Sequence, residues 1–256
     1  MFSRLFGKKE NKEEKDAAMV GGGDWSFIGT DMHSHFVPAV DDGAQTIEDS
    51  IALVRAMMDM GFKSIITTPH IKFDHFPNTR ETILTGLQAL HAALKEQGID
   101  LPVKAAAEYY IDDHFMQLLN SEPLLTIQGK EVLVELSFMF EPMNIYNVFF
   151  EIQTKGYRPI LAHPERYLFF HGKKDVYHQL RDKGVMLQLN TIALTGYYGK
   201  GVKETAEYLL ENKLYDYCGS DMHHLRHAEQ LKKVLDHKVM NTLRHYPFRN
   251  AQIQFI

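Results

Sequence analysis

Two histidines separated by one residue, His33 and His35, are the first residues of this sequence whose types and spacing could do chemistry. They follow an apolar run, Trp25 to Thr30, that we expect to form a buried strand. On an extended backbone, side chains two positions apart project to the same side, so both imidazoles could bind one ligand. Such a pair makes half of a metal site, but taken alone it also fits two surface histidines.

The same pattern recurs along the chain, and this recurrence favours a metal site. Five further β-type runs end in a histidine or a carboxylate, and a loop rich in Pro, Gly and Asp follows the first pair. These positions are His70, Glu108, Glu135, His163, Asp221 with His223, and Asp42 in the loop. The carboxyl ends of parallel strands meet at one edge of a sheet, so we expect these side chains to gather there.

The candidate site thus contains nine residues with imidazole or carboxylate groups, too many for one ion. Mixed nitrogen and oxygen ligands suit Mn, Fe or Zn, whereas a cage of oxygen atoms alone would suit Mg or Ca. We therefore expect two or three divalent transition-metal ions, with manganese as the first choice and iron or zinc as alternatives. Two ions ~3.5 to 4 Å apart are the usual apparatus for in-line displacement at phosphorus.

The elements that position these residues alternate between short apolar runs and amphipathic segments. Further strands are predicted over 62–68, 103–107, 132–135, 159–162, 185–189 and 215–219. We expect Thr46 to cap a helix that ends at Gly61, and Asn78 to cap one that runs to Gln97. Other helices are predicted over 145–155, 175–183 and 203–212. About seven strand–loop–helix units without a dinucleotide fingerprint favour an α/β barrel over an open sheet.

Composition bounds the organisation of the chain. With 256 residues, 45% of them hydrophobic, one barrel domain over 24–256 is expected. Residues 1–23 are rich in Lys and Glu and end in three glycines, so we expect a disordered tail. The first nine residues are basic and partly apolar, which permits a weak contact with a membrane surface.

Charge and cysteine content exclude some classes of partner and suggest a compartment. The net charge of −5 comes without a long basic stripe, so no nucleic-acid partner is expected. The single cysteine, Cys218, excludes an intramolecular disulfide and fits a reducing compartment. No apolar run reaches the ~18 to 20 residues that span a bilayer. We expect a soluble, cytoplasmic protein.

Seven short motifs between residues 27 and 226 carry a family resemblance that is specific when they are taken together. They are Asp31 to His35, Val40 to Gly43, Thr67 to His70, Ala107 to Tyr110, Val134 to Ser137, Ala162 to Arg166 and Gly219 to His223. With these motifs the sequence resembles the PHP (polymerase and histidinol phosphatase) superfamily. Within it, the sequence is most similar to the bacterial protein-tyrosine phosphatases of capsule and exopolysaccharide loci.

This resemblance implies a distorted (β/α)7 TIM-like barrel, the PHP fold, with a metal cluster at the strand ends. It implies that the nine candidate residues are the metal ligands and that Arg166 binds the substrate phosphate. Related sequences carry a second arginine after the Asp-Met-His motif; here Arg226 is only three residues after His223, so its role is open. The implied reaction is hydrolysis of protein phosphotyrosine, with the tail of a bacterial polysaccharide-export tyrosine kinase as the expected partner.

Three alternatives to this function require other residues or another kind of site. A phosphocysteine mechanism needs an arginine six residues after the cysteine, and His224 stands there after Cys218, which excludes it. A small-molecule phosphatase of the histidinol-phosphate type would need a closed pocket that the sequence does not reveal. A binding module that holds phosphotyrosine without turnover also remains open, although the intact set of candidate ligands argues against it.

Overall fold

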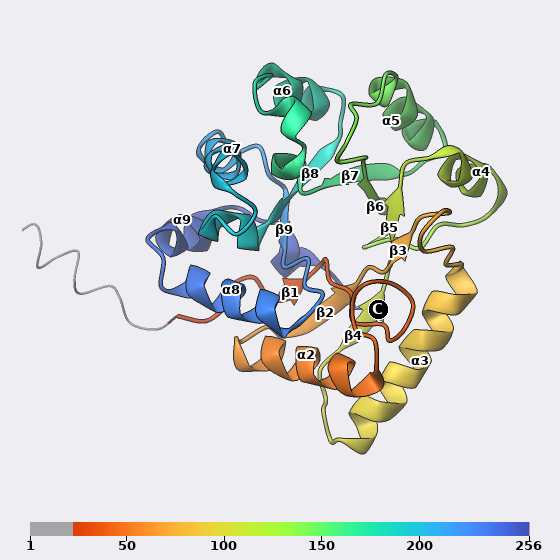
Figure 1. Cartoon of the computed structure of the whole chain (residues 1–256), viewed down its shortest axis with the longest axis vertical. Helices are drawn as coiled ribbons and strands as arrows, with labels where there is room; N and C mark the ends of the chain where they lie inside the picture. Colours follow the sequence, from red (N-terminus) through yellow and green to blue (C-terminus); the bar gives the residue numbers. More distant parts are fainter. Residues whose placement is uncertain (1–22, 256) are drawn as a thin grey trace, which may run out of the picture.

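Short parallel strands occupy the centre of the molecule, and helices surround them (Figure 1). The computed structural model describes residues 23–255, so the predictions for residues 1–22 lie outside it. One sheet has the order β1-β2-β4, with bounds Thr30–Asp31, Ser64–Thr67 and Val103–Ala105. The second has the order β3-β5-β6-β7-β8-β9, with bounds His70–Ile71, Glu108–Tyr110, Glu131–Glu135, Arg158–Ala162, Met186–Asn190 and Tyr217–Gly219.

The two sheets are joined by chain segments that contribute to both. Only two residues separate β2 from β3, and two separate β4 from β5. All the strand pairs are parallel, and their neighbours follow chain order. The result is a curled parallel sheet, which confirms the predicted mixed α/β class with a parallel arrangement.

The helices cover the outer side of this sheet (Figure 1). Their bounds are α2 Ile47–Asp59, α3 Arg80–Glu96, α4 Asp113–Ser121, α5 Ile145–Thr154, α6 Asp175–Asp182, α7 Lys200–Glu211, α8 Leu225–Leu235 and α9 Val239–His245. Short 3-10 helices also occur: η1 Pro164–Arg166 and η2 Leu168–Phe170 follow β7, η3 Thr191–Thr195 follows β8, and η4 Asn250–Gln252 follows α9. In the described part of the chain, no helix combines the length and apolarity that a membrane crossing requires.

Two local predictions are wrong for identifiable reasons. The run Trp25 to Thr30 is mostly a turn, and the strand begins only at Thr30. Trp25 is buried and stacks on Phe62. The apolar residues of this run therefore belong to a turn that packs into the core, and not to a strand. The cap of α3 is Thr79, because the Asn78 amide instead donates to the carbonyl oxygens of Val40 and His70. The predicted cap of α2, Thr46, is confirmed with a complete capping box.

The sheet packs apolar side chains on both faces. Leu133 and Ile160 belong to an inner cluster, while Val132, Val134 and Leu161 belong to the larger cluster under the helices. This alternation follows from the two-residue period of a strand. Buried polar side chains gather instead at the carboxyl ends of the strands.

Candidate metal centre

The nine predicted residues come together at the carboxyl ends of the strands. Most of them end a strand or follow one directly. Two begin the short strands β3 and β5, which continue β2 and β4 after a break of two residues, and one lies in the loop before α2. The placements are His33 and His35 after β1, Asp42 before α2, His70 on β3, Glu108 on β5, Glu135 on β6, His163 after β7, and Asp221 and His223 after β9. The breaks after β2 and β4 set His70 and Glu108 side by side as partners in the second sheet.

Glu108 lies at the middle of the cluster and is fully buried. Its Oε2 atom is 3.1 Å from His33 Nε2 and 3.2 Å from His70 Nδ1. Its other oxygen, Oε1, is 3.1 Å from His163 Nε2. With His35 Nε2 at 3.5 Å from Oε2, this one carboxylate faces four imidazoles, so it could contact more than one ion.

Three overlapping groups of donor atoms have the spacing of metal sites. In each group, one donor atom per residue lies within 4.8 Å of the others. The groups are His35, Asp42, His70 and His223; His33, His35, Glu108 and Asp221; and His70, Glu108 and Glu135. Every pair of groups shares one residue, so the three positions adjoin one another. His163 adds a donor 3.6 Å from Glu135 Oε1.

Hydrogen bonds from outside the cluster orient His33 and His35. Nδ1 of His33 donates to Gln188 Oε1 at 2.9 Å, and Nδ1 of His35 donates to Asp41 Oδ2 at 2.7 Å. With Nδ1 donating, each imidazole in its neutral form would turn the lone pair of Nε2 toward the cluster, and the two Nε2 atoms lie 3.4 Å apart. Both also face oxygens of Glu108 and Asp221, so a single cation could contact all four side chains.

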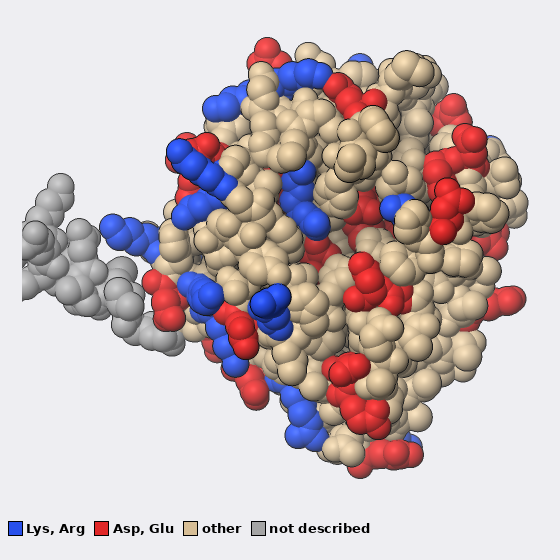
Figure 2. Space-filling view, viewed as in Figure 1, with Lys and Arg blue, Asp and Glu red and all other residues tan. Residues whose placement is uncertain are grey.

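The solvent side of the cluster is formed by Asp42 and His223. Nδ1 of His223 donates to the carbonyl oxygen of Asp221 at 3.0 Å, and Nε2 faces Asp42 Oδ1 at 3.4 Å. The Asp42 side chain is 58% exposed, whereas Glu108 is inaccessible. Figure 2 shows acidic side chains in a recess near the centre of this face, with basic side chains beside it. A ligand would enter from this side.

Arg166 brings positive charge to the cluster. Its Nη1 donates to Asp221 Oδ2 at 2.7 Å, and among the described lysines and arginines it alone forms an ion pair with one of the nine residues. The guanidinium lies between two aromatic rings, 4.6 Å from the centroid of Phe138 and 4.4 Å from that of Tyr198. These cation–π contacts and the ion pair fix its position.

The pKa values of Glu108 and Glu135 are shifted in opposite directions. Burial raises the pKa of Glu135 well above its usual value, and the charge of Glu108 adds to the effect. Burial also opposes ionisation of Glu108, but attraction to His33 and hydrogen bonds from the His33 and His163 imidazoles outweigh it and hold the pKa of Glu108 well below its usual value. Burial lowers the pKa of His70 to about 4, so this imidazole is neutral at pH 7.

Three residues that support the cluster were missed in the sequence. Asp41, assigned only to a loop, binds both His35 and the His70 backbone N–H. Gln188 holds His33, and the Asn190 amide donates to Asp221 Oδ2 at 2.9 Å. Gln188 and Asn190 are two positions apart on the buried strand β8, so their side chains point to the same side. Two polar residues at this spacing in an apolar strand are the sequence pattern that could have indicated them.

Two members of the cluster have an unusual backbone. His163 has a φ of 35° and Asp221 a φ of 50°, in the left-handed region that favours glycine. Both residues are nearly fully buried. Such conformations gather at functional sites, where the surrounding structure enforces them.

The two other candidate cations, Lys72 and Arg226, form no ion pair with the nine residues in the described part of the chain. Arg226 is exposed on α8, and within residues 23–255 no hydrogen bond or ion pair joins it to the nine residues. Lys72 places its ammonium group over the ring of Tyr110, 4.3 Å from the centroid. Arg166 is therefore the cation that the structure brings to the cluster.

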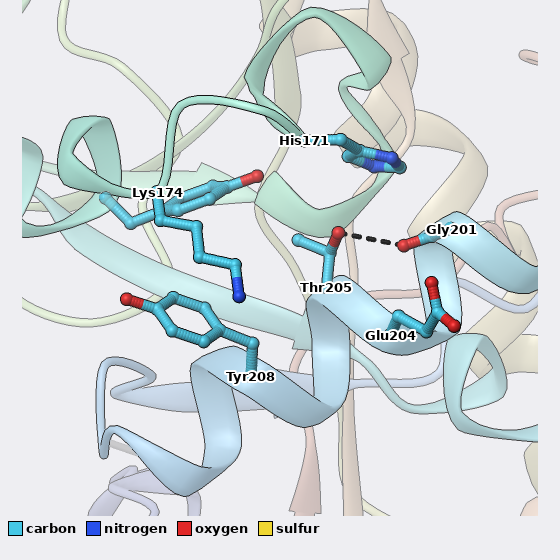
Figure 3. Close-up of a pocket in the computed structure, with 7 residues that line it drawn as sticks. His171, Lys174, Gly201, Glu204, Thr205 and Tyr208 are labelled. Carbon is cyan, nitrogen blue, oxygen red and sulfur yellow. Dashed lines mark hydrogen bonds between the residues drawn. The ribbon is translucent and has the colours of Figure 1, made fainter.

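A separate pocket of about 170 Å³ lies beside α7 (Figure 3). Lys174 and Tyr208 line it, and Thr205 donates to the carbonyl oxygen of Gly201 at 2.8 Å. None of the nine residues lines it. The metal-type chemistry of the described chain therefore lies at the strand ends, outside this pocket.

The fold and the cluster together define an α/β protein with a buried metal-type site of histidines and carboxylates. A family model described as "Capsular polysaccharide synthesis, CpsB/CapC" matches residues 29–243. The chain belongs to this family, which confirms the branch that the sequence motifs indicated.

Relatives of known name agree with this assignment. Tyrosine-protein phosphatase YwqE of Bacillus subtilis is 30% identical over 228 residues, covering 87% of this chain and 90% of the relative. Tyrosine-protein phosphatase CpsB of Streptococcus pneumoniae is 29% identical over 201 residues, covering 76% and 83%. A chain from the crystal structures of YwqE and CpsB, described as unique metal-dependent tyrosine phosphatases, superposes with a TM-score of 0.75 and 29% identity. That superposition covers 89% of this chain and 96% of the other.

Proposed function

We propose that this chain is a metal-dependent phosphomonoesterase that hydrolyses phosphotyrosine in proteins. The observation that carries the proposal is the convergence of nine metal-type side chains beside one fixed arginine. The names of its relatives supply the substrate class. The natural substrate is then a phosphotyrosine-bearing tail, in the first place that of a tyrosine kinase in polysaccharide export, acting in the cytoplasm.

The residues present suit a cluster of two or three divalent ions. Nδ1 of His70, on the side of the ring that faces Glu108, is buried without a hydrogen-bond partner, although buried polar atoms are normally paired. The Nε2 atoms of His33 and His35 lie 3.4 Å apart beside oxygens of Glu108 and Asp221, so one ion could contact all four side chains. We assign all nine residues as ligands. Their mixed imidazole and carboxylate set suits manganese, iron or zinc, and of these we propose manganese first.

When bound, the ions would lower the pKa of a water molecule and share the charge of the phosphoryl group. In our proposal Arg166 binds two phosphoryl oxygens with its planar guanidinium, which Asp221, Phe138 and Tyr198 hold in place. The departing phenolate has a pKa of about 10, so its protonation demands little of the protein. Arg226 has no part in this scheme, because it is exposed and apart from the cluster.

We also propose the finer description of the fold, a closed and distorted (β/α)7 barrel over 24–256. Counting β2 with β3 and β4 with β5 gives seven consecutive strands. An isolated parallel bridge between Ser34 and Met222 supports closure between the segments that follow the first and last strands. The Asn250 side chain adds to it by donating to the carbonyl oxygens of Thr30 and Cys218.

Protein purified without chelators is expected to contain two or three transition-metal ions per chain, because three donor groups adjoin in the cluster. Elemental analysis measures this content. Chelation should abolish hydrolysis of a phosphotyrosine peptide, and re-addition of Mn, Fe or Zn should restore it. Activity on histidinol phosphate is the parallel measurement and should be much weaker.

Each alternative function predicts a different outcome of this experiment. Preferred turnover of histidinol phosphate would indicate a small-molecule phosphatase. Tight binding of the peptide without turnover in the metal-loaded protein would indicate a binding module. Less than one ion per chain, unchanged by added Mn or Fe, would contradict the metal site itself.

Cys218→Ser is expected to retain most of the activity. The thiol is buried, 3.8 Å from Asn250 Oδ1, and burial raises its pKa well above the usual value, so it is not a thiolate at neutral pH. Initial rates on a phosphotyrosine peptide, compared at equal metal content, measure the effect. A loss of several hundred-fold in a folded variant would point to cysteine chemistry.

A further inference from the structure

Two loops beside the metal centre carry exposed apolar side chains. In the β6–α5 loop, Met139 is 78% exposed, Phe140 73% and Met143 98%, while Phe138 is 38% exposed. In the loop after β7, Leu168 is 65% exposed. We call these five residues the apolar rim. Single exposed apolar residues are common, but a gathered set marks an interaction surface.

The two loops are held next to each other. Strands β6 and β7 are paired, so their carboxyl ends are neighbours. The Glu141 carboxylate forms an ion pair with Lys173, which ties the first loop to the segment after Leu168. The Ser137 hydroxyl accepts hydrogen bonds from the backbone N–H groups of Met139 and Phe140, at 3.1 and 3.4 Å. The rim therefore has a defined place at the edge of the site.

The rim is continuous with the proposed phosphate-binding residue. Phe138 stacks on His163 with ring centroids 5.5 Å apart, and its ring faces the Arg166 guanidinium. Leu168 follows Arg166 by two residues. A phosphoryl group held by Arg166 would thus have an apolar surface directly beside it, where the rest of the substrate must lie.

We propose that the apolar rim binds the substrate around its phosphate, with Phe138 contacting the phosphotyrosine ring and Met139, Phe140 and Met143 contacting apolar residues next to it. The inference rests on the proposed function and adds a preference for peptides with apolar flanks. An aromatic ring gains from packing on another ring, a contact that phosphoserine cannot make. Displacement of water from exposed apolar side chains drives the contact with the flanks.

The flank preference is tested with the double variant Met139→Ser/Phe140→Ser. The matched control is Phe150→Ser, whose ring is also exposed (65%) but lies on α5, which begins at Ile145 after the loop. Substrates are a phosphotyrosine peptide with leucines on both sides and p-nitrophenyl phosphate, which has a ring but no flanks. We expect the ratio of kcat/KM for peptide to kcat/KM for the small substrate to fall about tenfold in the double variant only, about 1.4 kcal/mol.

The role of Phe138 is tested with Phe138→Leu. If the ring contacts phosphotyrosine, the preference for p-nitrophenyl phosphate over glycerol phosphate should fall several-fold. If Phe138 acts only by positioning Arg166, both substrates should lose kcat/KM equally, which would overturn its assignment to the rim. Metal content, measured in parallel, controls for damage to His163.

The remaining outcomes are also decisive. An unchanged ratio in the double variant overturns the rim proposal while leaving phosphatase activity intact. If that variant instead loses binding to anionic phospholipid vesicles, with peptide kinetics unchanged, the rim is a membrane contact and our assignment is wrong. A parent protein that hydrolyses none of these phosphomonoesters when loaded with metal would overturn both the proposed function and this inference.

Discussion

Glu108→Gln is expected to remove metal and phosphatase activity together. The residue belongs to two of the three donor groups, and its oxygens face His33, His70 and His163. An amide of the same shape loses the negative charge and one of the two acceptor oxygens. Loss of a partner outside the first coordination sphere of a metal commonly costs 10–100-fold, so loss of this central ligand should cost on the order of 10³-fold or more. Metal content and kcat/KM are measured on the same preparation.

The control for this substitution is Glu131→Gln, at the amino end of the neighbouring strand β6. Glu131 is equally buried, but it pairs with Arg158 and Arg249, away from the nine residues. Its substitution should lower thermal stability and leave the metal content of the folded protein unchanged. A Glu108→Gln protein with the parental number of ions per chain would show that Glu108 is not a ligand.

Arg166→Ala should retain its metal and lose roughly 2 to 4 kcal/mol of transition-state stabilisation, about 30- to 1,000-fold in kcat/KM. A guanidinium keeps its charge at any working pH and can bind two phosphoryl oxygens, so its removal affects the reacting group directly. The nine proposed ligands stay in place. Steady-state kinetics on a phosphotyrosine peptide, with elemental analysis, separate this loss from loss of metal.

Arg226→Ala is the matched removal of a positive charge. Because Arg226 is exposed on α8, its substitution should leave the rate near that of the parent protein. A large loss of rate in Arg226→Ala would show that Arg226 has the role of the second arginine found in related sequences. Parental kcat/KM in Arg166→Ala at subsaturating substrate would contradict the assignment of Arg166, and Lys72 would become the next cation to test.

Most of the nine residues could be found in the sequence because they end or follow a run with a recognisable period, whereas Asp42 was found from its loop rich in Pro, Gly and Asp. Strand β6 ends at Glu135 and β7 leads directly to His163, so the local pattern determines where the side chain emerges. The curled parallel sheet follows from the order of units. The single turn at Trp25 and the shift of the α3 cap to Thr79 depend on contacts with distant residues, which a local pattern does not contain.

The environment of the cluster was less accessible to prediction. Gln188 lies 155 positions from the histidine that it orients, and Tyr198 meets Arg166 only in the folded chain. Such contacts depend on which strand ends become neighbours in the fold. The resemblance to a family pointed to Arg166, but not to the two rings that enclose it. The contacts of Arg166 with Phe138 and Tyr198 are seen only in the folded structure.

The left-handed backbone at His163 and Asp221 places function and stability in opposition. Each such residue costs roughly 1–3 kcal/mol, against a typical margin of about 5–15 kcal/mol for a whole protein. Glycine would relieve this strain at either position, but it has no imidazole or carboxylate to offer. Selection for activity thus keeps two residues that selection for folding alone would replace. An ion that binds only the folded chain offsets the loss, so availability of metal would govern how long this protein survives in the cell as well as how fast it works.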